Sequence, residues 1–549
     1  MNPIDIFSHA VRAKEILAVF ARYGFGDLFE QLELPPGFWQ KLLPQPPPRR
    51  PPYERLRLAI EQLGPAFIKV GQLLSMRPDV MPEALILEFR KLQNNVHPVP
   101  FEEMRAVLEE ELNASVATVF AEFDTAPVAS ASLAQVYFAQ LRDGRAVAVK
   151  IQRPNQRKNF EIDLELMRWL IVQLDRRVPN LAAFHLPDVA EEIARAALLE
   201  LDFQHEARNQ RYFNAVNPTP KSVFAPELLP EFCSERVLVM ERIHGQPVDT
   251  VVPDPERARK LAAHGVHSLV HQVLIDGFFH GDPHGGNVLV TPDGRLCFLD
   301  WGLAGHLTRR LRYALADFFL AAIEQDSEQL VEIALELADT TTVDQRTLER
   351  EVALALREDF NHTIGHIQMG RAMVRLLFIL GSHGIRLSRD YSLMAKSMLS
   401  IEEIARKLDP TFDLQAAVSP VLVKLQSKRH GPAAVLRGTR AAVKSGLEGL
   451  RDLPVDLRRV LRRIERDDLT IRFQHKGLED LDDALKTASN RITLGVIIAA
   501  LLVGSSLIVT TKIEPYLFGY PALGIVGYLL SALLGLYVVW DIFRHGRHR

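Results

Sequence analysis

The spacing of hydrophobic and polar residues changes along the chain and separates helical stretches from strand-forming ones. Residues 53–92 follow a helical period, whereas residues 133–151 form two β-rich runs around the turn Arg142-Asp143-Gly144-Arg145. An Asp-Gly pair between two strand-like runs predicts a β-hairpin, and the same pattern recurs over residues 287–299. Further elements are expected as helices over 157–177, 188–216, 253–279 and 307–490, and as a strand over 236–240. The pattern predicts an α+β fold in which a small sheet with a long helix precedes a larger helical lobe.

The two ends of the chain have patterns of their own. Residues 1–43 are expected to form short helices, and the proline-rich stretch 44–52 is expected to be a stiff, extended linker. Residues 492–511 and 515–540 carry no charge and are nearly all apolar. Since about 20 helical residues cross a bilayer core, each run is long enough to span it. A buried core hairpin is the alternative, but two adjacent runs of this length favour a transmembrane helical hairpin.

Composition and charge narrow the class of protein. Hydrophobic residues make up 47% and charged residues 24% of the 549 residues, which excludes a disordered or low-complexity chain. The net charge of −3 argues against a protein that coats nucleic acid, so no nucleic-acid partner is expected. Two cysteines exclude a disulfide framework and favour a reducing compartment. No apolar run with a cleavage site begins the chain, so we expect it to stay in the compartment where it is made.

Three polar features follow one another in the order that phosphoryl transfer requires. Lys150 ends an apolar strand-like run, Asp282 and Asn287 lie five residues apart in a loop after a predicted helix, and Asp300 follows the second hairpin. A lysine can neutralise nucleotide phosphates, one aspartate can orient the nucleophile, and an asparagine with a second aspartate can hold Mg²⁺. Each feature alone is weak, because a lone strand lysine is commonly an edge charge. Their order and spacing, which match a protein-kinase catalytic loop, predict a site for ATP and Mg²⁺.

The glycine-rich phosphate loop of protein kinases has no counterpart before Lys150. A stretch of small residues stands in its place, and its members are Val128, Ala129, Ser130, Ala131, Ser132, Leu133, Ala134, Gln135 and Val136. Small side chains still let the backbone approach phosphates, but without glycine the loop is stiffer.

Together with these features, two further motifs make the chain resemble the UbiB family of atypical kinase-like proteins, also called aarF-domain kinases. Lys69-Val70-Gly71-Gln72 matches the family's KxGQ motif, and Glu200-Leu201-Asp202 resembles its ExD motif. The alanine-rich loop also matches its counterpart in the family. The motifs cover roughly residues 50–305. The resemblance implies a protein-kinase-like two-lobed fold with an N-terminal helical extension and a C-terminal transmembrane helical hairpin.

The same resemblance implies roles for individual residues. The alanine-rich loop, Lys150 and Glu206 would bind the nucleotide, Asp282 would be the catalytic aspartate, and Asn287 and Asp300 would be the Mg²⁺ ligands. The family's regulatory motif would cover the nucleotide site from an N-terminal helix, and its members are Lys69, Gly71, Gln72, Glu200 and Asp202. The less favoured alternative for Lys69 is an exposed helix lysine, and the alternative for Glu200 and Asp202 is a solvated acidic turn of helix. Departures from the common family residues occur at Asn94, Ser130 and Trp301 and touch no catalytic role.

The family is held to consist of ATPases or small-molecule kinases that support ubiquinone (coenzyme Q) biosynthesis. The resemblance implies an ATP-dependent phosphotransferase or ATPase that uses ATP and Mg²⁺ at a bacterial cytoplasmic (inner) membrane, with its catalytic region in the cytoplasm. The expected partners are membrane lipids, isoprenoid quinone intermediates and other ubiquinone-biosynthesis proteins. Two alternatives stay open: a small-molecule or lipid kinase acting on a prenylated intermediate, and a nucleotide-gated scaffold for biosynthetic enzymes.

These expectations divide the chain into five regions. The first two are a helical segment with the proline-rich linker (1–52) and a helical extension with the KxGQ motif (53–127). An N-lobe-like region with the alanine-rich loop, the strand lysine and the ExD helix (128–245) is followed by a helical C-lobe-like region with the catalytic loop and the metal aspartate (246–490). The last region consists of two transmembrane helices with a basic tail (491–549).

Two further patterns have a structural alternative. Five histidines could form a metal cluster, but packing against the catalytic loop is favoured, because no cysteine or carboxylate completes a ligand set. These histidines are His264, His267, His271, His280 and His284. An apolar stripe flanked by arginines over residues 453–464 fits a helix on an anionic membrane surface and a helix packed on the larger lobe equally well.

Overall fold

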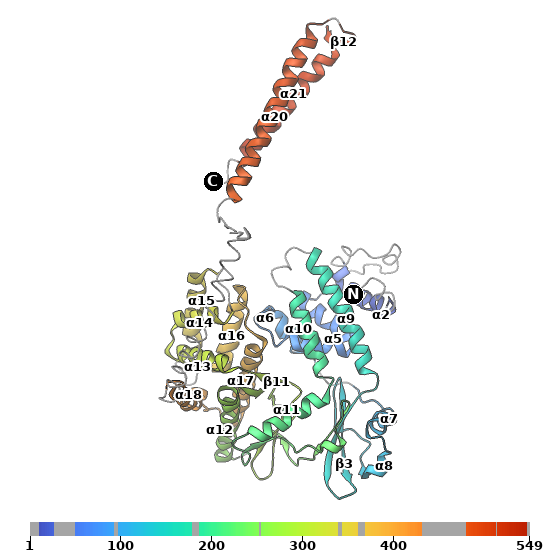
Figure 1. The fold of residues 1–549 in the computed structure, drawn as a ribbon, viewed down its shortest axis with the longest axis vertical. Helices are drawn as coiled ribbons and strands as arrows, with labels where there is room; N and C mark the ends of the chain where they lie inside the picture. Colours follow the sequence, from blue (N-terminus) through green and yellow to red (C-terminus); the bar gives the residue numbers. More distant parts are fainter. Residues whose placement is uncertain are drawn as a thin grey trace, which may run out of the picture. The chain divides into compact units, whose positions relative to one another are not determined.

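The computed structural model describes most of the chain, in two compact units. The described residues are 10–26, 50–92, 97–177, 186–251, 254–338, 343–360, 368–430, 479–511 and 513–545. The units comprise Met1–Leu436 and Arg437–Arg549 (Figure 1). The predictions made for residues 27–49, Asn94 and 453–464 lie outside the described residues.

Helices that precede the first sheet pack with two helices that lie between its strands β4 and β6 in the chain. These elements are α2 (Ala10–Phe20), η1 (Ala21–Phe25), α4 (Pro52–Leu63), α5 (Pro65–Leu74), α6 (Glu83–Phe89), α9 (Gln156–Arg177) and α10 (Leu186–Leu199). Ile16, Ile60, Phe67 and Leu166 share one buried apolar core among them. Figure 1 shows α5, α6, α9 and α10 gathered in one layer. Three helices thus occupy the stretch 53–92, where the sequence predicts a helical period.

The first sheet is antiparallel and carries helices on both faces. Its strands are β1 (Phe120–Phe123), β2 (Ala129–Ser130), β3 (Ala134–Leu141), β4 (Ala146–Gln152) and β6 (Val237–Glu241), in the order β1-β3-β4-β6 with β2 beside β3. The helices α7 (Phe101–Leu112), α8 (Val116–Val119) and α11 (Phe203–Val216) lie against it. Val149 and Ile151 point into the core with α7, so Lys150 between them faces the other side, where Phe203 and Ala207 of α11 pack. The strand period therefore decides that Lys150 faces α11.

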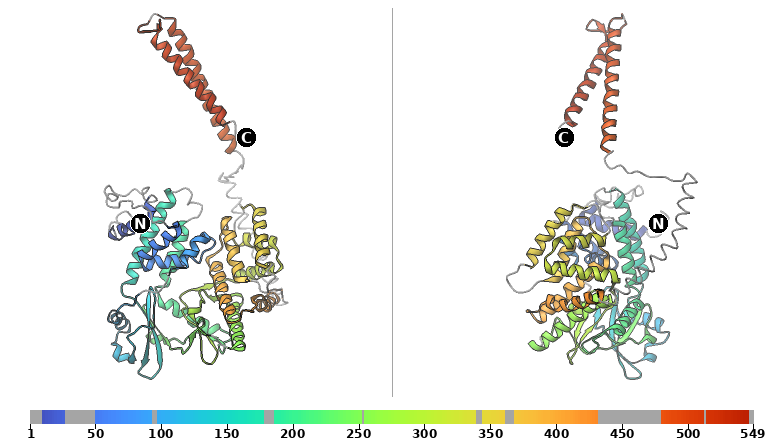
Figure 2. Two further views of the ribbon diagram at one scale, coloured as in Figure 1. Left: turned by 180° about the vertical axis from the view of Figure 1, so that it is seen from behind. Right: turned by 60° about the vertical axis from the view of Figure 1, so that its left-hand side comes forward.

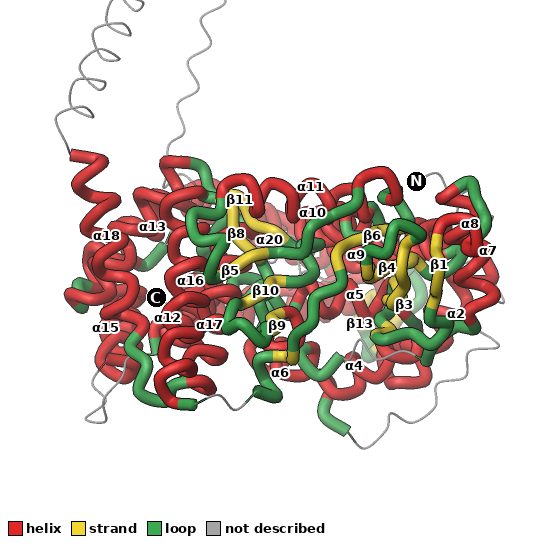
Figure 3. The backbone as a smooth tube through the Cα atoms, turned by 90° about the horizontal axis from the view of Figure 1, so that it is seen from below, coloured by secondary structure: helices red, strands yellow, loops and turns green. Residues whose placement is uncertain are grey.

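Shorter strands follow and position the predicted catalytic loop (Figure 3). The four strands β5 (Val223–Phe224), β7 (Gln246–Pro247), β9 (Val288–Val290) and β10 (Leu296–Phe298) form a sheet in the order β5-β10-β9-β7, and β8 (Phe278–His280) pairs with β11 (Ala304–His306). The single turns η4 (Pro230–Phe232) and η6 (Gly285–Asn287) lie between strands. Both hairpins predicted from Asp-Gly pairs are confirmed, with Gly144 at φ 89° and Gly294 at φ 83°.

Helices make up the rest of the larger lobe. They are α12 (Pro255–His271), η5 (Gln272–Asp276), α13 (Arg309–Glu324), α14 (Ser327–Ala338), α15 (Gln345–Phe360), α16 (Met369–Ser382), α17 (Arg389–Leu408) and α18 (Leu414–His430). Their buried faces join the apolar side of α5 and α10 in the largest core of the molecule, which includes Val70, Ala197 and Trp301. The extension is therefore part of the folded body of the first unit and not an appendage.

Two helix predictions need correction. The stretch 188–216 is not one helix, because the chain breaks at Glu200-Leu201-Asp202 and Asp202 then caps α11 by accepting a hydrogen bond from the Gln204 amide at 2.9 Å. The helix expected over 253–279 ends at Asp276, because Gly277 at φ 72° turns the chain into strand β8.

The second unit is a pair of long apolar helices joined by a short hairpin. Its elements are α20 (Glu479–Val509), β12 (Tyr516–Leu517), β13 (Tyr520–Pro521) and α21 (Ala522–His545). The segments Ile492–Val509 and Ala522–Trp540 have mean hydropathies of 2.6 and 2.2, and only 6% and 11% of them is buried. The two helices run side by side in Figures 1 and 2, and a Cβ on Gly527 would lie 2.0 Å from Ser505 Oγ. Both helices are long and apolar enough to cross a membrane, and their exposure argues against the core of a soluble domain.

Candidate active site

Three charged residues that lie far apart in the sequence meet near the C-terminal end of strand β4. The Lys150 ammonium lies 2.9 Å and 2.7 Å from the two carboxylate oxygens of Glu206, and 3.5 Å from Asp300 Oδ1. Strand β4 supplies Lys150, helix α11 supplies Glu206, and the turn after β10 supplies Asp300. Phe203, one turn before Glu206, places its ring centroid 5.2 Å from the same ammonium. The structure thus joins the strand lysine to both acidic groups that the sequence assigns to the nucleotide and the metal.

The electrostatics of this ion cluster follow from burial and mutual attraction. The Lys150 ammonium lowers the pKa of Asp300 to about 2, against the effect of burial. Burial raises the pKa of Glu206 to about 7, and the negative Asp300 adds to this while Lys150 opposes it. Burial lowers the pKa of Lys150, but Asp300 and Glu206 outweigh it and raise the pKa above its usual value. Near neutral pH the cluster therefore holds a charged lysine beside a charged Asp300.

A buried histidine shapes the loop that carries Asp282, the expected catalytic aspartate. His280 is 0% exposed, and its Nε2 lies 2.8 Å from the Leu299 carbonyl oxygen, which can only accept a hydrogen bond. Nε2 therefore carries the proton, and Nδ1 accepts the Asp282 backbone N–H at 3.1 Å. Burial lowers the pKa of His280 and keeps the ring neutral. The ring packs edge-on against Trp301 at 4.7 Å, so one side chain ties the Asp282 loop to the Asp300 turn.

The Asp282 carboxylate faces a helix of the larger lobe. Lys396 on α17 places its ammonium 2.9 Å from Asp282 Oδ1, and the two side chains are 26% and 22% exposed. Burial raises the pKa of Asp282, but the charges of Lys396 and His284 outweigh this and lower it overall. Lys396 is a residue that sequence reasoning missed. No motif surrounds it, and only the packing of α17 against the loop brings it to the site.

The two expected metal ligands lie on either side of one hairpin. The Leu299 amide donates to the Asn287 carbonyl at 2.8 Å, and this bond brings the end of β10 back to Asn287 next to Asp300. Asn287 Nδ2 donates to the Asp282 carbonyl at 3.2 Å, which leaves the side-chain oxygen without a partner among the described residues. Asp300 has a φ of 55°, a left-handed conformation that aspartate tolerates better than most residues.

The side-chain oxygens of Asn287 and Asp300 suit a Mg²⁺ ion that is bound together with a nucleotide. Mg²⁺ prefers oxygen ligands and is commonly bound by one or two protein side chains while phosphates and water complete the octahedron. Asn287 and Asp300, brought near one another by the hairpin, each offer a side-chain oxygen of this kind. In the part of the chain that the structure describes, no group of three His, Cys, Asp or Glu residues could hold a metal ion by itself.

The alanine-rich loop forms a tight hairpin that joins strands β2 and β3 of the first sheet. Ala129 pairs with Val136, Ser130 with Gln135, and the Ala131 amide donates to the Ala134 carbonyl at 2.9 Å. Gln135 is 0% exposed, and its amide oxygen and nitrogen bond to the backbone of Val99 at 2.6 Å and 3.2 Å. The Gln135 side chain therefore anchors the chain before α7, while the role of the loop's backbone in binding phosphates stays a prediction.

The KxGQ motif lies on α5 against the start of the ExD motif. Lys69 forms an ion pair with Glu200, and the two side chains are only 13% and 11% exposed, which excludes the alternative of an exposed helix lysine. Its positive charge contributes to the lowered pKa of Asp300. Gly71 has no room for a side chain, because a Cβ there would lie 2.4 Å from Leu92 Cδ1. Gln72 donates to the Leu92 carbonyl at 3.2 Å, so both residues hold α5 against the end of α6.

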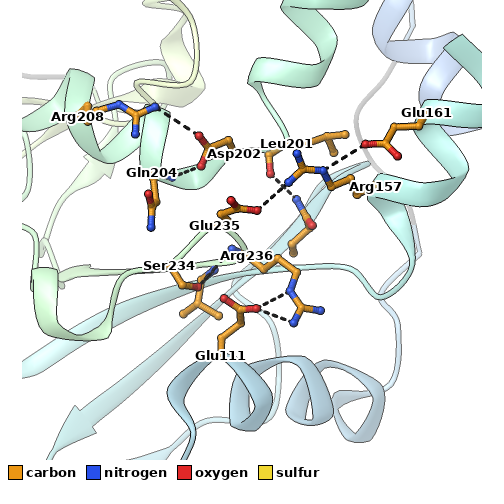
Figure 4. Close-up of polar contacts among 12 residues, drawn as sticks. Glu111, Arg157, Glu161, Leu201, Asp202, Gln204, Arg208, Ser234, Glu235 and Arg236 are labelled. Carbon is orange, nitrogen blue, oxygen red and sulfur yellow. Dashed lines mark hydrogen bonds and ion pairs between the residues drawn. The ribbon is translucent and has the colours of Figure 1, made fainter. Parts of the chain in front are cut away.

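Asp202 plays a different part from Glu200. It caps α11 and forms an ion pair with Arg208 at 3.3 Å (Figure 4), whereas Glu200 is the residue that pairs with Lys69. The same region is tied to the first sheet, because Gln152 Nε2 donates to the Leu201 carbonyl at 2.9 Å and Arg157 pairs with Glu235 at 2.7 Å. These contacts position the N-terminus of α11, and with it Glu206.

The other expected histidines have separate surroundings. His271 Nδ1 lies 3.1 Å from Asp276 Oδ2, and His284 Nδ1 accepts the Gly286 amide at 3.1 Å. His267 stacks near His271 on α12, with ring centroids 6.3 Å apart. His280 and His284 thus lie in the predicted catalytic loop, as the favoured interpretation expects, whereas His267 and His271 contact groups on α12 and η5.

Comparisons with known proteins identify the family. Residues 91–334 match the ABC1 atypical kinase-like domain, residues 355–413 the UbiB helical domain, and residues 476–544 the ABC1/UbiB kinase-like C-terminal domain. An uncharacterized protein in the hydrogenase 1 5′ region of Clostridium pasteurianum is 31% identical over 97% of this chain and 99% of its own length. Proteins named probable protein kinase UbiB are 32% identical in Xylella fastidiosa strain M23, over 70% of this chain and 71% of theirs, and 30% identical in Xanthomonas campestris strain B100, over 82% and 83%.

A solved structure of Rv3197 with erythromycin from Mycobacterium tuberculosis aligns with 65% of this chain and 97% of its own, at a TM-score of 0.41 and 23% identity. The domain matches confirm the kinase-like α+β fold, with helical regions and two apolar C-terminal helices, that the motifs predict. A kinase-like domain in turn implies nucleotide binding. Since three domain matches and relatives at 30–32% identity agree over most of its length, the chain belongs to the ABC1/UbiB family of atypical kinase-like proteins.

Proposed function

We propose that this chain is a Mg-ATP-dependent ATPase or phosphotransferase that supports ubiquinone biosynthesis at the bacterial cytoplasmic membrane. The observation that carries the catalytic part is the ion cluster, in which Lys150 lies 2.7 Å from Glu206 and 3.5 Å from Asp300. A charged lysine held between a helix carboxylate and a second aspartate is the arrangement that places a nucleotide's phosphates and its metal in one cleft.

Each side chain then has one task. Lys150 neutralises phosphate oxygens, and Glu206 fixes the direction of the lysine. Asp282 orients the attacking hydroxyl or water. Asn287 and Asp300 would hold Mg²⁺, which supplies positive charge to the phosphate oxygens when it is bound. The neutral His280 keeps the Asp282 backbone and the Asp300 turn in register through its two ring nitrogens.

Membrane location and the ubiquinone role rest on other support. The segments Ile492–Val509 and Ala522–Trp540 are long and apolar enough to anchor the chain in a bilayer. The relatives in Xylella fastidiosa and Xanthomonas campestris bear the name UbiB. Isoprenoid quinone intermediates are dissolved in the membrane, so an anchored enzyme would meet them in two dimensions.

A second candidate is a small-molecule kinase, favoured by one specific observation. A cavity of about 410 Å³ opens at Asp282 and is covered by α5 and α6, so it admits a small acceptor and leaves little space for a folded protein substrate. A nucleotide-gated scaffold is less favoured, because Lys150, Glu206, Asp282, Asn287 and Asp300 are all present and are brought together.

The test follows the γ-phosphate of labelled ATP. Full-length protein in lipid nanodiscs is incubated with Mg-ATP, with and without prenylated phenols, and the label is traced into phosphate, lipid or protein. Free phosphate supports an ATPase, and a labelled lipid supports the kinase. Parental turnover by Asp282→Asn would contradict both, and normal ubiquinone in cells that carry only this variant would contradict the biosynthetic role.

A further inference from the structure

A lysine from a distant helix supplies a charge that the catalytic loop lacks. The segment from His280 to Asn287 contains no lysine or arginine. His284, the nearest basic residue after Asp282, already uses Nδ1 to accept the Gly286 amide. Lys396 on α17 contacts Asp282 Oδ1 at 2.9 Å. Among the described residues, Lys396 is the only ion-pair partner of the Asp282 carboxylate.

Contacts on two sides hold Lys396 in place. Ser397, its neighbour on α17, donates to the His280 carbonyl within the catalytic loop. Ser392, one turn before Lys396, donates to Asp79 Oδ1 at 3.0 Å. The side chains of Ser392 and Asp79 are buried. Helix α17 is therefore fixed to the loop on one side and to the segment after α5 on the other, and Lys396 projects from between these anchors.

The contact of Lys396 with Asp282 forms part of the wall of the 410 Å³ cavity. One wall is a polar stripe of α17, made of Ser392, Lys396, Ser400 and Glu403. The extension lines the cavity with apolar side chains (Met76, Ile86, Phe89 and Leu92) and polar ones (Lys69, Gln72, Ser75 and Arg90). A cavity of this size, lined by apolar side chains together with several polar and charged groups, has the character of a small-molecule site.

We propose that this cavity is the acceptor site of the phosphoryl reaction, for water or a small hydroxyl compound, and that Lys396 is a further catalytic residue within it. The proposal rests on the function proposed above. Lys396 holds Oδ1 of Asp282, so that Oδ2 is directed to the acceptor hydroxyl. Because an ammonium has three N–H donors and Asp282 takes one, the others are available to oxygens of the transferred phosphoryl group.

The step balances without any further reagent. The acceptor oxygen bonds to the γ-phosphorus while the bond from that phosphorus to the β–γ bridging oxygen breaks, and ADP leaves with the electron pair. The acceptor proton passes to Asp282 and then to solvent. ATP and ROH thus give ADP, the phosphorylated acceptor and a proton, and with water the product is inorganic phosphate. Lys396 offsets negative charge on the phosphoryl oxygens during the transfer.

The experiment compares two lysines of the same helix in the full-length chain in lipid nanodiscs. Lys396→Met removes the proposed charge but keeps the length of the side chain. Lys407→Met is the matched control, because Lys407 also lies on α17 and its ammonium is also 2.9 Å from a carboxylate, Asp249 Oδ1. The rate kcat, the KM for ATP, the Kd for a non-hydrolysable ATP analogue and the melting temperature are measured for each variant and for Lys396→Arg.

Lys396→Met should lower kcat on the order of 100-fold while KM and the analogue's Kd stay within about threefold of the parent. Lys396→Arg should recover a large part of kcat, and Lys407→Met should match the parent. The proposal is overturned if Lys396→Met keeps the parental kcat. It is also overturned if kcat, nucleotide affinity and melting temperature all fall together without rescue by arginine, because Lys396 then serves only the fold. A parent without ATP turnover, or an active Asp282→Asn, would instead refute the proposed function itself.

Discussion

Removing the Lys69 ammonium should destabilise the first unit, and removing its partner as well should restore most of the loss. Lys69 and Glu200 form an ion pair in which the side chains are 13% and 11% exposed. Glu200 Oε1 is buried and has no hydrogen-bond partner among the described residues. Lys69→Met therefore leaves a carboxylate with little water and no positive charge beside it.

The magnitude follows from that burial. Breaking a fully buried ion pair on one side costs roughly 3–5 kcal/mol. Since both side chains keep about a tenth of their exposure, the cost should be at or somewhat below the lower end of this range, and we expect a loss of about 2–3 kcal/mol. At roughly 2 °C for each kcal/mol, the melting temperature should fall by about 4–6 °C. The double variant Lys69→Met/Glu200→Gln leaves neither charge alone, so it should regain most of that difference.

The assay is thermal unfolding of the full-length chain in detergent at neutral pH, without nucleotide. Lys260→Met serves as the control, because Lys260 pairs with Glu256 on the surface of α12 and should show almost no shift. Two results would refute the reasoning: a parental melting temperature for Lys69→Met, or a double variant whose loss is the sum of the two single losses. Ubiquinone content of cells that carry only Lys69→Met, at parental protein level, then tests whether the motif also matters for function.

The remaining predictions concern the nucleotide, the loop, pH and the membrane. Lys150→Met should weaken Mg-ATP binding at least tenfold, measured by titration calorimetry, because the ion cluster loses its only lysine contact with Asp300 among those described; unchanged affinity would contradict the assignment. Ala129→Gly should change nucleotide affinity, since glycine frees backbone angles in the hairpin, and an identical Kd would argue against a phosphate-binding loop. Burial lowers the pKa of His280 below 6.5, its value in the unfolded chain, so the stability that His280 contributes is complete above pH 6.5 and is lost as the pH falls through the folded-state pKa. His280→Gln should therefore flatten this part of the plot of unfolding free energy against pH. An unaltered plot would show that another group titrates there. Single cysteines placed just before Ile492 and after Trp540 should both react with a thiol reagent only from the cytoplasmic side, because basic residues flank the pair of spans, and labelling from the periplasm would reverse this topology.

Local patterns in the sequence determine much of this protein, because they encode which face of an element is buried. The period of two along β4 places Val149 and Ile151 in the core and turns Lys150 to the opposite face. The Asp-Gly pairs specify both hairpins, and the second hairpin returns the chain so that Asp300 follows Asn287 across one backbone bond. The apolar runs at the C-terminus need only their length to predict the two long helices.

Tertiary structure alone decided the contacts between elements that no local pattern links. Glu200 and Asp202 are two residues apart, yet the break between α10 and α11 sends the first to Lys69 and leaves the second as a helix cap. Gln135 belongs to a loop of small residues, yet its side chain is used to hold Val99. Lys396 reaches Asp282 only because α17 is anchored on both sides of it. A sequence period reports how deeply a residue is buried, but the identity of its partner depends on how whole helices pack, and that is settled by the shapes and charges of segments far apart in the chain.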